Sequence, residues 1–162
     1  MLLKGILDED FINYKVPSMF ISTNTCSFKC DKENGSQVCQ NSSLAKQESI
    51  DIDIDLIIKR YLKNDITSAI VFGGLEPVDQ LVDIYDFIFK LRNDYRCEDP
   101  VIIYTGYEKE EIKNKISVLF PFRNIIIKFG RFRPGDKPHL DPILGVNLAS
   151  NNQYSEVLSS EK

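Results

Sequence analysis

Three of the four cysteines in this 162-residue chain lie close together near its beginning. Cys26, Cys30 and Cys39 fall within fourteen mostly polar residues that contain one glycine and show no apolar periodicity. A free cysteine kept for packing behaves as a small hydrophobic residue and belongs in apolar segments. Clustered thiols in a polar loop, here residues 24–45, instead indicate a metal or cluster site. The loop follows a predicted strand at Ser18–Thr23, and open α/β sheets and barrels place their chemistry at the carboxyl ends of strands.

The number of nearby thiols limits which metal fits. Structural zinc takes four ligands, usually as two closely spaced pairs. Cys26 and Cys30 can form one pair, but Cys39 stands alone, and the remaining candidates, Cys97 and His139, are remote in sequence. Three local thiolates suit a 4Fe-4S cluster with one iron left without a protein ligand, since ferredoxin clusters use four cysteines. On the cysteines alone we favour a cluster, and a zinc site stays open.

Composition and charge bound the class of protein. Hydrophobic residues make up 43% of the chain and charged residues 27%, which is ordinary for a globular protein and predicts a single domain over residues 1–162. The net charge of −4 gives no reason to expect a nucleic acid as partner. Charged residues among the first ten positions argue against a secretory signal, and the apolar runs are too short to span a membrane. We therefore expect a cytoplasmic protein with reduced cysteines and no disulfide framework.

Apolar patterns predict the elements that position the cysteine loop. Strands are expected near residues 3–6 and at 18–23, 68–72, 101–104, 124–129 and 143–148. Helices are expected at about 50–62, 78–95 and 108–119, and a frayed tail from 151, flexible from about 154 to 162. Alternating strands and helices predict right-handed crossovers and a parallel sheet. The expected fold class is a compact α/β protein with a parallel sheet of βα repeats, an incomplete TIM-like barrel.

A second candidate site is the turn Phe72-Gly73-Gly74-Leu75-Glu76-Pro77, which also follows a predicted strand. Two adjacent glycines let a ligand approach the backbone without a Cβ in the way. Glu76 offers an acceptor beside the free N–H groups of the next helix, a surface suited to a zwitterion. The alternative is a plain strand-to-helix turn in which glycine supplies positive φ and Pro77 begins the helix. The turn matches neither the phosphate-binding loop nor the dinucleotide-binding fingerprint.

Taken together, the cysteine loop and the glycine turn resemble the radical S-adenosylmethionine superfamily. Its usual cluster motif is Cys-x3-Cys-x2-Cys, and its Gly-Gly-Glu motif binds the amino group of S-adenosylmethionine. The chain is similar in particular to the small activating proteins of anaerobic ribonucleotide reductase, over about residues 5–153, including Tyr104-Thr105-Gly106-Tyr107 and Lys128-Phe129-Gly130-Arg131-Phe132. It departs from the family by eight residues between Cys30 and Cys39, where two are usual, and by the inserted Leu75.

The resemblance implies both the cofactors and the residues that bind them. The ligands it implies for a 4Fe-4S cluster are Cys26, Cys30 and Cys39. The residues it implies for S-adenosylmethionine are Gly73, Gly74, Glu76 and Pro77. It implies no catalytic side chain beyond the cofactors.

The activity implied by the resemblance is that of an oxidoreductase, a glycyl-radical enzyme activase. Such an enzyme cleaves S-adenosylmethionine reductively and generates a glycyl radical on the large subunit of an anaerobic ribonucleotide reductase. Its electron donor is a reduced flavodoxin or ferredoxin, and no nucleic acid or membrane takes part. Two alternatives stay open: another small radical S-adenosylmethionine enzyme with a different substrate, and a non-catalytic zinc module completed by Cys97 or His139.

The last third of the chain carries a basic stretch in an otherwise acidic protein. Its members are Arg123, Lys128, Arg131, Arg133 and Lys137. They form either a solvated face or a docking surface for an acidic partner.

Overall fold

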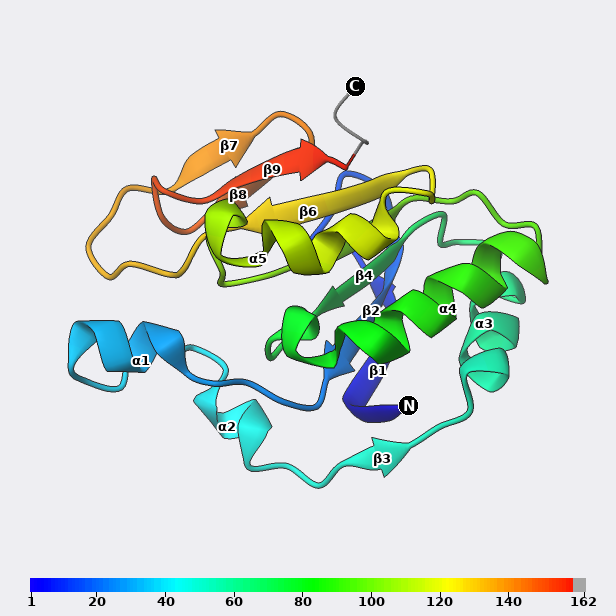
Figure 1. Ribbon diagram of the computed structural model, residues 1–162, viewed down its shortest axis with the longest axis horizontal. Coiled ribbons are helices and arrows are strands. Elements are labelled where there is room, and N and C mark those ends of the chain that lie inside the picture. The colour runs from blue at the N-terminus through cyan, green and yellow to red at the C-terminus, as the bar shows by residue number, and fades with distance from the viewer. Residues whose placement is uncertain (159–162) are drawn as a thin grey trace.

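A computed structural model describes residues 1–158, which are arranged around one mixed seven-stranded sheet with the strand order β3-β1-β2-β4-β5-β6-β9 (Figure 1). The strands of this sheet are β1 (Leu2–Asp10), β2 (Ser18–Thr23), β3 (Ile50–Asp51), β4 (Ile70–Gly73), β5 (Val101–Tyr104), β6 (Ile125–Phe129) and β9 (Tyr154–Val157). A separate hairpin is formed by β7 (His139–Asp141) and β8 (Val146–Leu148). The helices are α1 (Lys29–Asn34), α2 (Ser42–Ala45), α3 (Ile54–Leu62), α4 (Leu81–Asn93) and α5 (Lys109–Ile116), with 3₁₀ turns η1 (Pro77–Gln80) and η2 (Ser117–Leu119).

The centre of the sheet is parallel, as the sequence predicts. Strands β2, β4, β5 and β6 are successive neighbours, with Ile21 opposite Phe72, Phe72 opposite Ile103 and Ile103 opposite Ile127. These side chains are fully buried. Strands covered on both faces read as apolar runs, which is why the sequence reveals β4, β5 and β6. Their carboxyl ends meet at one edge, where α1 and α2 lie (Figure 1).

Both outer parts of the sheet are antiparallel, so the expectation of a purely parallel sheet is wrong there. Strand β1 pairs antiparallel with β2 and with β3, and β9 pairs antiparallel with β6. Residues 154–157, expected in a flexible tail, are held in β9, where the backbone N–H and the hydroxyl of Ser155 both donate to the carboxylate of Asp141. Residues 159–162 lie outside the described part. The seven strands form an open sheet, and a TIM-like barrel stays a prediction.

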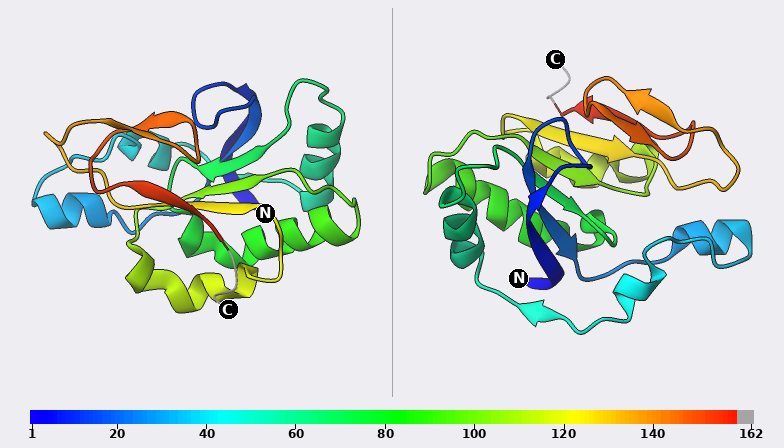
Figure 2. Two further views of the ribbon diagram at one scale, coloured as in Figure 1. Left: turned by 90° about the horizontal axis from the view of Figure 1, so that it is seen from above. Right: turned by 180° about the vertical axis from the view of Figure 1, so that it is seen from behind.

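Two different layers cover the faces of the sheet (Figure 2). Helices α4 and α5 lie on one face, and their buried side chains, with those of α3, join the main core. The hairpin of β7 and β8 and the segment between β1 and β2 lie on the opposite face, above a smaller core. That smaller core consists of Tyr14, Ala69, Val71, Ile102, Ile126, Leu144 and Leu148. The second layer is thin, and this leaves room for a cavity on its side of the sheet.

The predicted helices form with local differences. Asp53 caps α3 by accepting the N–H of Asp55 at 2.8 Å, and Ile57, Ile58 and Tyr61 form its buried face. Leu56 and Leu62, although apolar, lie off this face and are 60% and 44% exposed. The helix expected at 78–95 is divided into η1 and α4. Within residues 1–158, no helix has the length and apolar character needed to cross a membrane.

Candidate functional site

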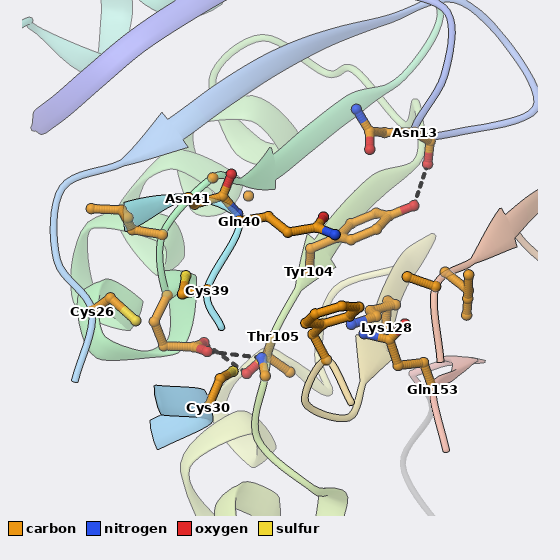
Figure 3. Close-up of a pocket in the computed structure, with 18 of the residues that line it drawn as sticks. Asn13, Cys26, Cys30, Cys39, Gln40, Asn41, Tyr104, Thr105, Lys128 and Gln153 are labelled. Atoms are coloured by element: carbon orange, nitrogen blue, oxygen red, sulfur yellow. Dashed lines mark hydrogen bonds between the residues drawn. The ribbon is translucent and has the colours of Figure 1, made fainter. Parts of the chain in front are cut away.

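One cavity of about 540 Å³ lies at the carboxyl ends of the parallel strands and brings the two predicted motifs together. Its lining includes the three clustered cysteines and, from the glycine turn, Gly73, Gly74 and Glu76. In Figure 3 the cysteines surround one end of the cavity, and Tyr104, Lys128 and Gln153 lie at the other. Pro77, also predicted as a binding residue, is buried but does not line the cavity.

One side chain holds the third cysteine near the second, although eight residues separate them in the sequence. The sequence predicts an irregular loop here, and the structure instead places Cys30 in the short helix α1. Asp31, the next residue, accepts hydrogen bonds through Oδ1 from the backbone N–H groups of Val38 and Cys39, each at 2.8 Å. This carboxylate therefore brings Cys39 back towards Cys30 despite the eight residues between them.

Two of the three thiols, those of Cys26 and Cys30, lie in an environment that favours their protonated form. Burial raises the pKa of Cys26 to about 11, and although the N–H of Phe28 opposes this rise, the charge of Glu76 adds to it. Burial also raises the pKa of Cys30. Only thiolates bind metals, so loading the site releases protons.

The number of donors fits a cluster better than a zinc ion, because Cys26, Cys30 and Cys39 line the cavity with no fourth Cys or His among the described lining residues. A zinc ion needs all its thiolate ligands about 2.3 Å from one point. Within residues 1–158, no three His, Cys, Asp or Glu side chains converge in that way. A 4Fe-4S cluster is a larger body, and its thiolates bind separate irons and stand farther apart. The extra zinc ligands are also misplaced, because Cys97 packs against the main core and His139 lies on β7, both outside the cavity lining.

Glu76 is the centre of a buried hydrogen-bond network beside the cysteines. Its Oε1 accepts from the N–H of Val78 at 3.0 Å and the hydroxyl of Thr105 at 2.7 Å, and its Oε2 accepts from the N–H of Gly106 at 2.8 Å. Its own N–H donates to Thr25 in the cysteine loop at 2.8 Å. Burial raises the pKa of this carboxyl, and the three donors oppose that rise. Glu76 thus joins the turns after β4 and β5 to the loop that carries the thiols.

The two glycines of the turn meet a steric requirement as well as lining the cavity. Gly74 has a φ of +79°, and a Cβ there would lie 2.9 Å from Leu44. A Cβ on Gly73 would lie 2.8 Å from the ring of Phe20. The plain-turn interpretation therefore explains part of the motif, and the same two residues also line the cavity.

Lys128 is a cavity residue that sequence reasoning assigned to a surface. Its side chain is buried, and Nζ donates to the carbonyl of Gly130 at 2.9 Å. Burial lowers the pKa of this lysine to about 8. Among the described residues that line the cavity it is the only Lys or Arg. The signal was present in the sequence, because a lysine that follows three isoleucines in a buried strand needs a reason to be there.

The five basic residues at 123–137 do not share one surface. Lys128 lines the cavity, and Arg131 is buried and paired with Glu111 and Glu33. Only Arg123, Arg133 and Lys137 are exposed. Neither a solvated face nor a docking surface therefore includes all five residues, and docking through the three exposed ones stays a prediction.

Comparison with known proteins identifies the class to which this site belongs. Residues 17–152 match the family model described as a 4Fe-4S single cluster domain, and the chain belongs to that family. The match spans both motifs and every strand of the parallel core. No curated protein and no solved structure matches the chain.

Proposed function

We propose that this 4Fe-4S protein is a radical S-adenosylmethionine enzyme. The observation that carries the proposal is the meeting of Cys26, Cys30 and Cys39 with the Gly-Gly-Leu-Glu turn in one cavity, although the two motifs are distant in sequence. When bound, the reduced cluster would supply the electron that splits the sulfonium of S-adenosylmethionine into methionine and a 5′-deoxyadenosyl radical. The cavity volume of about 540 Å³ lies within the range of roughly 300–1,000 Å³ typical of small-molecule sites.

The residues of this chain would orient the zwitterionic end of S-adenosylmethionine with charges of opposite sign. The carboxylate of Glu76 uses three of its roughly four acceptor positions internally, which leaves one for an ammonium group. The buried ammonium of Lys128 supplies a positive charge for a carboxylate. The attraction between opposite charges is stronger in a cavity than in water, because the surrounding dielectric constant is lower.

We further propose, following the sequence resemblance, that the radical acts on a partner protein. The proposed partner is the large subunit of an anaerobic ribonucleotide reductase, in which a glycine Cα–H bond is broken and a glycyl radical remains. A reduced flavodoxin or ferredoxin is the proposed electron donor. The chain itself would bind the small molecule, hold it still and exclude water from the cavity.

Lys128→Met tests the binding part of the proposal. The loss of a charge-assisted hydrogen bond, worth about 1.5–3 kcal/mol, should weaken S-adenosylmethionine binding roughly ten- to a hundredfold. In the wild type, affinity should fall as pH rises above about 8, because the carboxylate ligand needs the protonated lysine. Removing a buried charge should leave the fold intact.

The measurement is a calorimetric titration of the reconstituted protein with S-adenosylmethionine between pH 6.5 and 9.5. Arg133→Met is the matched control, since it removes one positive charge from an exposed residue outside the cavity. Equal affinity in Lys128→Met and wild type, with full iron content in both, would refute the assignment of Lys128.

A further inference from the structure

The short helix α1 carries Cys30, yet apolar packing does not hold it in place. None of the six residues of α1 is buried, and no side chain caps its first turn. The residue before it, Phe28, has a φ of +52°, a conformation that is unfavourable for a residue with a side chain. A helix this short is unstable alone in water. Another interaction must therefore hold α1 in position.

Four charged side chains supply that interaction through a chain of alternating charges. Nη2 of Arg131 donates to both oxygens of Glu111, at 2.6 and 2.7 Å. Nε of Arg131 forms an ion pair with Glu33 at 3.2 Å, and Nζ of Lys29 binds Glu111 at 3.1 Å. Lys29 and Glu33 lie four residues apart on α1, on either side of Cys30. The network thus joins α1 to α5 and to the segment after β6.

Because Arg131, the central residue of this network, is buried, its ion pairs are stronger than an ordinary surface pair. The side chain of Arg131 is 7% exposed, whereas those of Lys29 and Glu33 are 41% and 58% exposed. Arg131 also holds the pKa of Glu111 down, at about 2, so both members of this pair are charged near neutral pH. The ring of Tyr107 completes the contact, with Nζ of Lys29 4.5 Å from its centroid.

We propose that Lys29, Glu33, Glu111 and Arg131 form an ionic latch that docks α1 and so fixes the position from which Cys30 presents its sulfur. Arg131 is then a positioning residue for the cluster rather than part of a partner-docking surface. The inference rests on the proposed role of Cys30 as a cluster ligand, but the docking of α1 is measurable without any cluster.

The test compares backbone hydrogen exchange in the metal-free, reduced, full-length chain. Arg131→Met should speed exchange of the amides in residues 32–34, the first of which donates to the carbonyl of Phe28, about tenfold, equivalent to about 1.4 kcal/mol. Glu33→Gln, which changes an exposed side chain, should speed it roughly two- to fivefold. Arg60→Met is the matched control, because Arg60 binds Asp8 through two 2.6 Å contacts far from the latch. It should leave exchange in α1 unchanged.

A second measurement links docking to the cluster. After anaerobic reconstitution, Arg131→Met should hold less iron than wild type and give a broadened electron paramagnetic resonance signal in the reduced state. Arg131→Lys keeps the charge and should recover part of both properties.

The possible outcomes separate the latch from the proposed function. Exchange in α1 that equals wild type in both Arg131→Met and Glu33→Gln would overturn the latch. If Arg131→Met does not fold, Glu33→Gln alone tests the latch, and exchange in α1 of that variant equal to wild type would overturn it. A wild-type chain that takes up no iron would contradict the proposed function, while the exchange data would still decide whether the latch exists.

Discussion

Cys39→Ala is expected to abolish the iron–sulfur cluster, and Cys26→Ala and Cys30→Ala should have the same effect. All three thiols line one end of the cavity, and Asp31 holds Cys39 there through two backbone hydrogen bonds. A cluster that already has only three protein ligands has no spare thiolate to replace a missing one. Iron per chain should fall from about four atoms to near zero.

Iron content and visible absorbance after anaerobic reconstitution provide the measurement. Cys97→Ala is the matched control and should keep the full cluster, because Cys97 packs against the main core outside the cavity. Full iron content in Cys39→Ala would show that the long gap excludes Cys39 from the ligand set, and the assignment would be wrong.

Glu76→Ala is expected to destabilise the fold as well as the binding site. The substitution leaves three donors without an acceptor: the N–H groups of Val78 and Gly106 and the hydroxyl of Thr105. Each unsatisfied buried group costs about 1–3 kcal/mol, and some will find water, so the expected loss is roughly 3–5 kcal/mol of unfolding free energy. Such a loss is a large part of the stability of an ordinary domain.

Urea unfolding of the metal-free chain measures this loss. Asp53→Ala is the control, because it removes one exposed capping bond to Asp55 and should cost about 1 kcal/mol. Glu76→Gln keeps an oxygen for Val78 and Thr105. Its loss of unfolding free energy should lie between those of Glu76→Ala and Asp53→Ala. If Glu76→Ala is no less stable than Asp53→Ala, the network around Glu76 does not support the fold, and its carboxylate serves only a ligand.

The sequence predicts the centre of this fold well, and the reason is burial. Strand β2 has the predicted bounds, and β4, β5 and β6 lie within or next to their apolar runs. The outer antiparallel strand β9 was missed because the segment Tyr154–Val157 is short and half polar. Its place depends on the contact between Ser155 and Asp141, fourteen residues away in sequence. Patterns of periodicity do not contain such a contact.

In the candidate site, too, the sequence predicts the features that are local and misses those that depend on distant contacts. Residue type and spacing identify the cysteines and the glycine turn, because those features are local. The roles of Asp31, Lys128 and Arg131 depend on where their side chains point after folding, and a charged residue in a sequence does not reveal its partner. The single local clue was the position of Lys128 within an apolar strand.

The central claim, that this 4Fe-4S protein cleaves S-adenosylmethionine, is tested most directly by its products. Anaerobically reconstituted chain, reduced with dithionite and mixed with S-adenosylmethionine, should yield 5′-deoxyadenosine and methionine in equal amounts. The Cys39→Ala chain, treated in the same way, should yield neither. A wild-type chain that carries a full, reducible cluster and still forms no 5′-deoxyadenosine would contradict the proposal and leave an iron–sulfur protein of another kind.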